Sequence, residues 1–130
     1  MDYKIKYVRD EKRRPVVTEC FAFDEAVFMC KTMAICNEKD TPNKKFGVNL
    51  AIRRAEQYIT KDKESQKAVF LRTLTRKVTP RWLRVLLPPL FTRASANHRV
   101  PLVQTDYELM TDDDKKFIDR VIERKLSAAT

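Results

Sequence analysis

Apolar and polar residues alternate along the start of the chain with the period of a β-strand. Tyr3, Ile5 and Tyr7 are separated by charged and polar positions, and a period of two predicts a strand over 3–9 with one buried face. A charged stretch follows and predicts a turn. The next segment, 15–23, is rich in Val, Thr and Phe, which predicts the second strand of an antiparallel hairpin.

The segment 26–36 fits two structures. Asp24 can cap a helix that begins here, whereas apolar side chains distributed evenly over alternate positions are typical of a strand covered on both faces. We predict a strand, because both sets of alternate positions are equally apolar. Residues 1–37 then form a three-stranded antiparallel meander.

The central part of the chain has helical periodicity. Thr41 and Pro42 predict a helix start, because Thr caps helices and Pro suits the first helical position. Two further helices are predicted, over 65–78 and over 81–87, and the second ends at a pair of prolines. In the helix that starts at Thr41 and Pro42, the apolar residues recur on one stripe: Phe46, Leu50, Ala51, Ala55, Tyr58 and Ile59.

The remaining residues divide into an irregular segment and a strongly patterned helix. Residues 88–105 have no period and contain three prolines, so we predict an extended arm or loop. The last helix follows Thr111, with three aspartates in its first turn and Arg124 and Lys125 in its last turn, as the helix dipole favours. Its inward side is predicted to hold Phe117, Ile118, Val121, Ile122 and Leu126.

These elements predict one α+β domain, in which a small antiparallel sheet of about three strands is packed by three or four helices. No apolar run reaches the length of a membrane span, and the first residues lack the apolar core of a signal peptide. We therefore expect a cytoplasmic protein. Its predicted parts within 1–130 are the meander (1–37), a basic helical region (41–87), the arm (88–105) and the C-terminal helix (106–130).

The positive charge of the chain is concentrated in its middle. Residues 1–40 contain eight basic and eight acidic residues. Residues 41–99 contain fourteen basic and three acidic residues, and residues 106–130 contain five basic and seven acidic residues. The formal net charge of +9 therefore comes from one block. Such a block repels itself in a folded protein, and it usually meets a polyanion, most often nucleic acid.

The candidate phosphate-binding residues are basic side chains of this block. Neighbours one helical turn apart would contact successive phosphates. A basic face that served only solubility is one alternative, but such a face would mix both signs of charge. An acidic protein surface is another alternative partner, because it would attract the same block. The predicted set is Lys44, Lys45, Arg53, Arg54, Arg72, Arg76, Lys77, Arg81, Arg84, Arg93 and Arg99.

Two predicted helix starts oppose the helix dipole. Lys44 and Lys45 stand in the first turn of one helix and Arg81 in that of another, where the exposed amide groups repel a cation. A bound anion would resolve the conflict, and side chains that turn into solvent would resolve it equally well. A small phosphorylated nucleotide at the Pro42 helix start is therefore an alternative ligand.

The sequence predicts no enzyme. Its three cysteines, at 20, 30 and 36, lack zinc-site spacing and adjoin apolar residues, so we expect buried free thiols. His98 is the only histidine, and it has no recognisable catalytic or metal-binding partner. Gly47 is expected to allow close helix packing, and Trp82 is expected in the core. We expect no catalytic residue, no bound metal and no cofactor.

One stretch of the chain resembles a group of viral proteins. Thr32–Asp40, followed by Asn43–Gly47 and Ala51–Ala55, is similar to small uncharacterised early or accessory proteins encoded by bacteriophages. In those proteins a strand ends in a Cys-x-x-x-Asp turn, and a basic helix with one glycine and an Ala-x-x-Arg-Ala segment follows. The resemblance implies a phage accessory protein that acts in the cytoplasm of a bacterial host, including against host functions or defences. It implies no catalytic residues.

The leading prediction is non-enzymatic binding of DNA or RNA through the basic block. The alternatives are an inhibitor that binds a host protein or defence complex, and a binder of a small nucleotide. The sequence leaves the oligomeric state open, including a homodimer.

Overall fold

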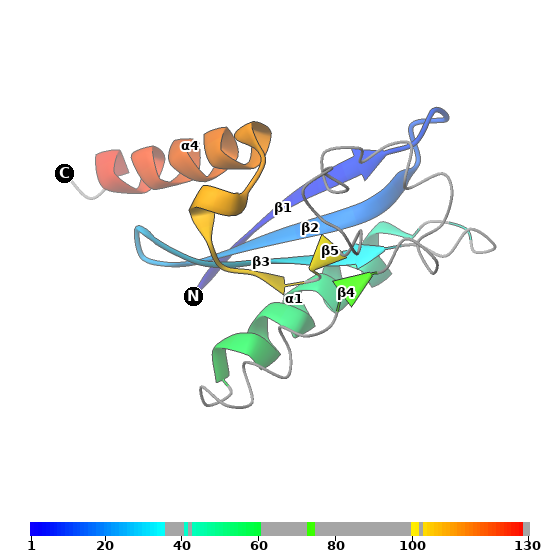
Figure 1. Cartoon of the computed structure of the whole chain (residues 1–130), viewed down its shortest axis with the longest axis horizontal. Coiled ribbons are helices and arrows are strands. Elements are labelled where there is room, and N and C mark those ends of the chain that lie inside the picture. Colours follow the sequence, from blue (N-terminus) through cyan, green and yellow to red (C-terminus); the bar gives the residue numbers. More distant parts are fainter. Residues whose placement is uncertain (36–40, 42, 61–72, 75–99, 102, 129–130) are drawn as a thin grey trace.

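The computed structural model describes residues 1–35, 41, 43–60, 73–74, 100–101 and 103–128. Strands β1 (Asp2–Arg9), β2 (Pro15–Asp24) and β3 (Val27–Ile35) form an antiparallel meander (Figure 1). The α+β class, the antiparallel sheet and the strand over most of 26–36 are thus confirmed.

The two turns of the meander are tight and contain no glycine. Arg13 and Glu25 take up the left-handed backbone conformation, with φ of 61° and 53°. In the first turn the Asp10 carboxylate accepts hydrogen bonds from the backbone N–H groups of Lys12 and Arg14, at 3.0 and 2.9 Å. An aspartate that satisfies the amides of its own turn holds the loop closed, so the charged stretch predicted as a turn has a defined structure.

The sheet has one strand more than predicted. β6 (Val103–Gln104) pairs antiparallel with β3, so the strand order is β1-β2-β3-β6. It lies inside the segment predicted as an arm or loop. A two-residue strand carries no period of its own, and it forms because β3 offers an unpaired edge.

A second pair of short strands corrects a predicted helix. β4 (Thr73–Leu74) pairs antiparallel with β5 (Val100–Pro101), so the helix predicted over 65–78 is wrong at 73–74, where backbone pairing with a distant segment replaces the helical hydrogen bonds. The rest of that helix and the whole of the one predicted over 81–87 lie outside the described residues.

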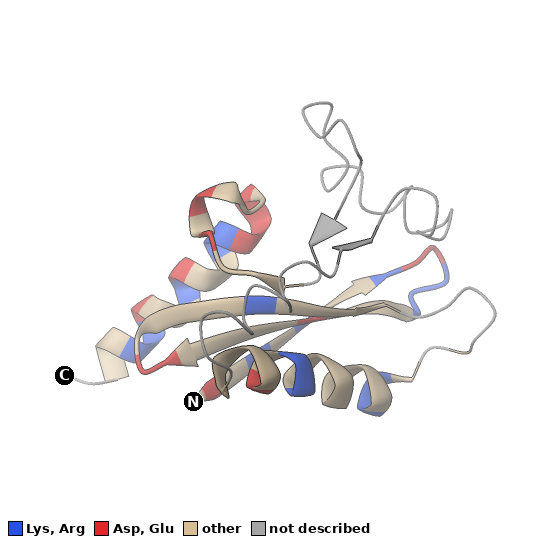
Figure 2. Ribbon diagram, turned by 60° about the horizontal axis from the view of Figure 1, so that its bottom comes forward, with Lys and Arg blue, Asp and Glu red and all other residues tan. Residues whose placement is uncertain are grey.

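The two faces of the sheet are covered by different helices because side chains alternate along each strand. Cys20, Ala22 and Cys30 pack on α1 (Lys44–Thr60), whereas Phe21 and Phe23 pack on α4 (Asp112–Ala128). Figures 1 and 2 show the two helices on opposite sides of the sheet. The described residues contain these two α-helices of the three or four that the sequence predicts.

Helix α1 starts later than predicted. Its cap is Asn43, whose side-chain Oδ1 accepts a hydrogen bond of 3.1 Å from the N–H of Phe46. Thr41 lies outside the helix, and Pro42 is outside the described residues. The predicted apolar stripe is confirmed at the buried Ala51 and at Ala55, but Phe46 is 67% exposed. Its place on the stripe was wrong because the first turn extends past the edge of the core.

Gly47 explains how closely α1 approaches the sheet. A Cβ atom at this position would clash with Oγ1 of Thr18 on β2, so either the Thr18 side chain or the helix would have to move. Ala51 lies one helical turn after Gly47, and its carbonyl accepts a hydrogen bond of 2.7 Å from the hydroxyl of Thr32 on β3. The interpretation of Gly47 as a packing residue is thus confirmed.

Helix α4 begins as predicted. The Thr111 hydroxyl accepts a hydrogen bond of 3.2 Å from the N–H of Asp114, and three aspartates occupy the first turn. Leu126 is 55% exposed rather than inward, because the last turns extend beyond the sheet (Figure 1). A short 3-10 helix, η2 (Tyr107–Leu109), precedes α4 and was not predicted.

Candidate functional site

The first turn of α1 and the β1–β2 turn bring two basic segments together. Tyr7 on β1 pairs with Thr18 on β2, and Thr18 is the residue against which Gly47 packs. The helix therefore crosses the sheet close to Tyr7. The Lys44 ammonium lies 5.2 Å from the centre of the Tyr7 ring, and the Arg9 guanidinium lies 5.5 Å from it.

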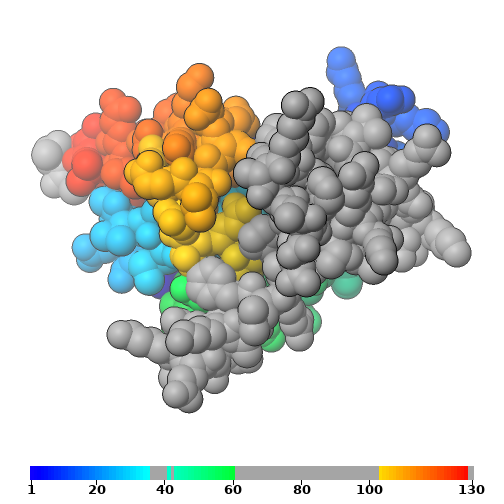
Figure 3. All heavy atoms as spheres, in the orientation of Figure 1, coloured from blue at the N-terminus to red at the C-terminus, as the bar shows by residue number. Residues whose placement is uncertain are grey.

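We call the exposed cations of these two segments the basic end, which consists of Arg9, Lys12, Arg13, Lys44 and Lys45. Figure 2 shows both segments at the same end of the sheet, and Figure 3 shows the β1–β2 turn at the opposite end of the molecule from the last turn of α4. The α1 part of the basic end, Lys44 and Lys45, lies on the opposite side of the sheet from α4 and its acidic first turn.

The charges of the basic end are not neutralised by the described part of the protein. Arg14 forms an ion pair with Asp10, with Nε and Oδ2 2.8 Å apart. The Arg9 guanidinium donates instead to the carbonyl of Arg13, at 3.0 Å. None of the five cations of the basic end forms an ion pair with a described carboxylate. Asp10 and Glu11 lie in the same turn, but the basic side chains of the two segments outnumber them, and such an excess of cations attracts an anionic partner.

The predicted conflict between Lys44, Lys45 and the helix dipole has one partial answer in the structure. The Lys44 ammonium lies within the distance at which an aromatic ring attracts a cation. Lys45 is exposed and has no ion-pair partner among the described residues. The dipole conflict therefore persists at Lys45, where a bound anion would relieve it.

The other described candidates on α1 differ from each other. Arg53 is exposed, and its spacing of seven residues from Phe46 places both on the same side of the helix. Arg54 is half-buried, and its guanidinium donates a hydrogen bond to the carbonyl of Met33, so that it fastens α1 to β3. The other predicted site residues lie outside the described residues: Arg72, Arg76, Lys77, Arg81, Arg84, Arg93 and Arg99.

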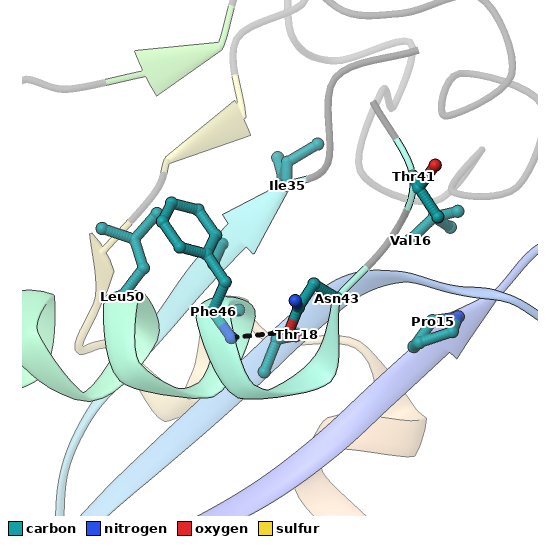
Figure 4. Close-up of a pocket in the computed structure, with 10 residues that line it drawn as sticks. Pro15, Val16, Thr18, Ile35, Thr41, Asn43, Phe46 and Leu50 are labelled. Atoms are coloured by element: carbon teal, nitrogen blue, oxygen red, sulfur yellow. Dashed lines mark hydrogen bonds between the residues drawn. The ribbon is translucent and has the colours of Figure 1, made fainter. Parts of the chain in front are cut away.

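A pocket of about 180 Å³ opens beside the first turn of α1. Its walls come from the start of β2, the end of β3 and α1, and they are mostly apolar. Figure 4 shows Phe46 and Leu50 pointing from the helix toward the end of β3 at Ile35. Thr41 and Asn43 add polar groups to the lining at the helix start.

The contribution of the β1–β2 turn to the basic end was not predicted from the sequence. Arg9, Lys12 and Arg13 were placed in a charge-neutral N-terminal part, and they join the basic block only because α1 packs over Tyr7. The run of basic residues at 12–14 was a visible signal. Its position next to Lys44 was not, because that position depends on contacts between distant segments.

A second charged cluster lies on the opposite face of the sheet and is buried. Lys31 on β3 is 2% exposed, and Glu19 and Asp114 are nearly as buried. The Lys31 ammonium forms ion pairs with Glu19 and, at 2.5 Å, with Asp114. The Lys6 ammonium contacts Asp113 at 2.6 Å and Asp114 at 3.3 Å.

The cluster fastens the start of α4 to the sheet. Burial lowers the pKa of Lys6, but the hydrogen bond to Asp113 and the nearby carboxylates outweigh it, so its pKa is raised above the ordinary value. Each buried charge has an opposite partner, which is the condition under which burial is tolerated. The aspartates predicted only to cap α4 therefore also anchor it.

The described cysteines are not reactive. Cys20 and Cys30 are free and buried, and burial raises their pKa to about 11 and about 12. A thiol with such a pKa is almost fully protonated at neutral pH and is a weak nucleophile. Cys36, His98 and Trp82 lie outside the described residues. In the described ranges, no three His, Cys, Asp or Glu side chains gather as metal ligands.

No protein-family model, curated protein or solved structure matches the chain. Among the described helices, none combines the length and the apolar character that crossing a bilayer requires.

Proposed function

We propose that this protein binds nucleic acid without a catalytic step and that the basic end holds the phosphates. The observation that carries the proposal is the meeting of two basic segments around Tyr7, with no described carboxylate paired to their five cations. Gathering like charges costs free energy in the free protein, and phosphates bound there would recover it.

The arrangement suits a charged backbone better than one small anion. The five cations come from the end of β1, the β1–β2 turn and α1, so they extend over a surface rather than surround one point. Arg53 continues that surface along α1, and the predicted basic residues between 72 and 99 would extend it further. A polymer with one charge per nucleotide matches such a row.

A host protein with an acidic surface is the second candidate. It is favoured by the exposed Phe46 ring beside the cations, because aromatic and basic side chains together are also typical of protein interfaces. The resemblance to phage accessory proteins stays a prediction and fits either partner.

The test is the salt dependence of binding to fluorescent DNA and RNA. Five phosphate contacts give a slope of log affinity against log salt of about −4.5 for duplex DNA and about −3.5 for single strands. The K44A/K45A variant should reduce the magnitude of the slope by about 1.8 for duplex DNA and about 1.4 for single strands. The matched control K116A/R124A removes two exposed charges from α4 and should leave it unchanged.

Two results would overturn the proposal: affinity that does not change with salt, or equal losses in the two double variants. A stoichiometric complex with an acidic protein, formed without affinity for bulk DNA or RNA, would replace it by the second candidate.

A further inference from the structure

Phe46 is an exposed aromatic side chain in the first turn of α1, the turn that also carries Lys44 and Lys45 of the basic end. Its side chain is 67% exposed although it sits on a helix that buries its other apolar side against the sheet. Lys44 and Lys45 precede it in the chain and are exposed, and neither forms an ion pair with a described carboxylate. An exposed aromatic ring close to cations is the combination that proteins use to stack bases while holding phosphates.

The pocket beside Phe46 has the character that one base requires. Its walls include Val16, Ala34 and Leu50, and its polar groups lie at the helix start. The Asn43 side-chain oxygen already accepts the hydrogen bond from Phe46, so its amide N–H groups are the donors left to face a ligand. A nucleobase has flat apolar faces and polar edges, so it matches apolar walls with polar groups at one end.

The size of the pocket limits what enters it. About 180 Å³ is below the range of roughly 300–1,000 Å³ that holds a whole drug-sized ligand. One ring system fits such a space, and the sugar and phosphate would remain outside it. Lys44 and Lys45 do not line the pocket; they are exposed and precede Phe46 in the chain, and they carry the charges that a phosphate needs.

We infer that this site takes an unstacked base of a single-stranded nucleic acid, with the base against Phe46 and the flanking phosphates on Lys44 and Lys45. The inference rests on the proposed function and adds the substrate class. A duplex keeps its bases stacked and paired, so their faces do not reach Phe46, whereas a single strand presents them freely.

The test compares F46A, F46W and L109A on single-stranded and duplex oligonucleotides of equal length over a series of salt concentrations. Leu109 is 83% exposed on η2, which makes L109A a matched control for loss of an exposed apolar side chain. Because Phe46 is exposed, F46A should unfold at the wild-type temperature. Adenosine and uridine monophosphate serve as the small-ligand probes.

The expected result is a single-strand affinity that falls by about tenfold in F46A, which corresponds to loss of one stacked base. Duplex affinity and the salt slope should not change, F46W should restore single-strand binding, and L109A should behave as the wild type. The monophosphates should bind far more weakly than the oligonucleotides, because they offer a single phosphate.

The inference is overturned if F46A binds single strands as tightly as the wild type while K44A/K45A still weakens them. In that case the basic end holds phosphates alone, and the proposed function stands. It is also overturned if the monophosphates bind as tightly as the oligonucleotides. Failure of every nucleic acid to bind in a salt-dependent manner would instead refute the proposed function itself.

Discussion

Replacing Lys31 by Met tests how α4 is fixed to the sheet. Met retains much of the length of the lysine side chain and removes its charge. The substitution leaves Glu19 and Asp114 buried without their shared cation. Lys6 still lies 3.3 Å from Asp114, so Glu19 loses more than Asp114 does.

Removing one partner of a buried ion pair costs about 3–5 kcal/mol. Because Lys6 compensates part of the loss, we expect K31M to lower the free energy of unfolding by about 3 kcal/mol, near the lower end of that range. This is a large share of the roughly 5–15 kcal/mol that stabilises an ordinary domain. The triple variant K31M/E19Q/D114N removes the orphaned charges and should regain about 2 kcal/mol.

Urea unfolding followed by circular dichroism measures these differences. The control is K4M, whose lysine lies on the same strand face as Lys6 but is exposed, with its ammonium 3.5 Å from Asp2. An exposed pair of this kind contributes about 0–1 kcal/mol. The reasoning is refuted if K31M costs no more than K4M, or if the triple variant is no more stable than K31M alone.

Two further predictions concern the packing of α1 and the pH dependence of stability. G47A should destabilise the protein by about 1–2 kcal/mol, because the clash with Thr18 outweighs the better helix propensity of alanine. In urea unfolding, G47A should lower the free energy of unfolding less in a T18A background than in the wild type. Equal losses in the two backgrounds would contradict the clash. The hydrogen bond from Lys6 lowers the pKa of Asp113, so its carboxylate stabilises the fold above the ordinary carboxyl pKa, and this contribution is lost as the pH falls through the lowered value. The difference in unfolding free energy between wild type and D113N should therefore be present at pH 6 and shrink toward pH 3, and a difference that grows in acid would contradict the assignment.

Local patterns were sufficient to predict most of the sheet and the final helix. The alternation around Tyr3, Ile5 and Tyr7 and the cap at Thr111 depend on near neighbours only, and both appear as expected. Even the ambiguous strand β3 was predictable, because a strand covered by helices on both faces has apolar residues in both of its alternating sets of positions.

What the sequence could not show depends on contacts between distant segments. Lys31 and Asp114 are 83 positions apart, so nothing near either residue indicates that they form a buried pair. The strand over 73–74 exists because residues 100–101 pair with it. Arg9 belongs to the candidate site only because its guanidinium and the Lys44 ammonium both lie against the Tyr7 ring in the folded protein.

The slope of log affinity against log salt for a single-stranded oligonucleotide tests the central claim most directly. If the basic end holds phosphates, the wild-type slope is about −3.5, and K44A/K45A lowers its magnitude by about 1.4. A slope near zero, or the same slope in K44A/K45A and the wild type, would show that the cations around Tyr7 do not bind a nucleic-acid backbone.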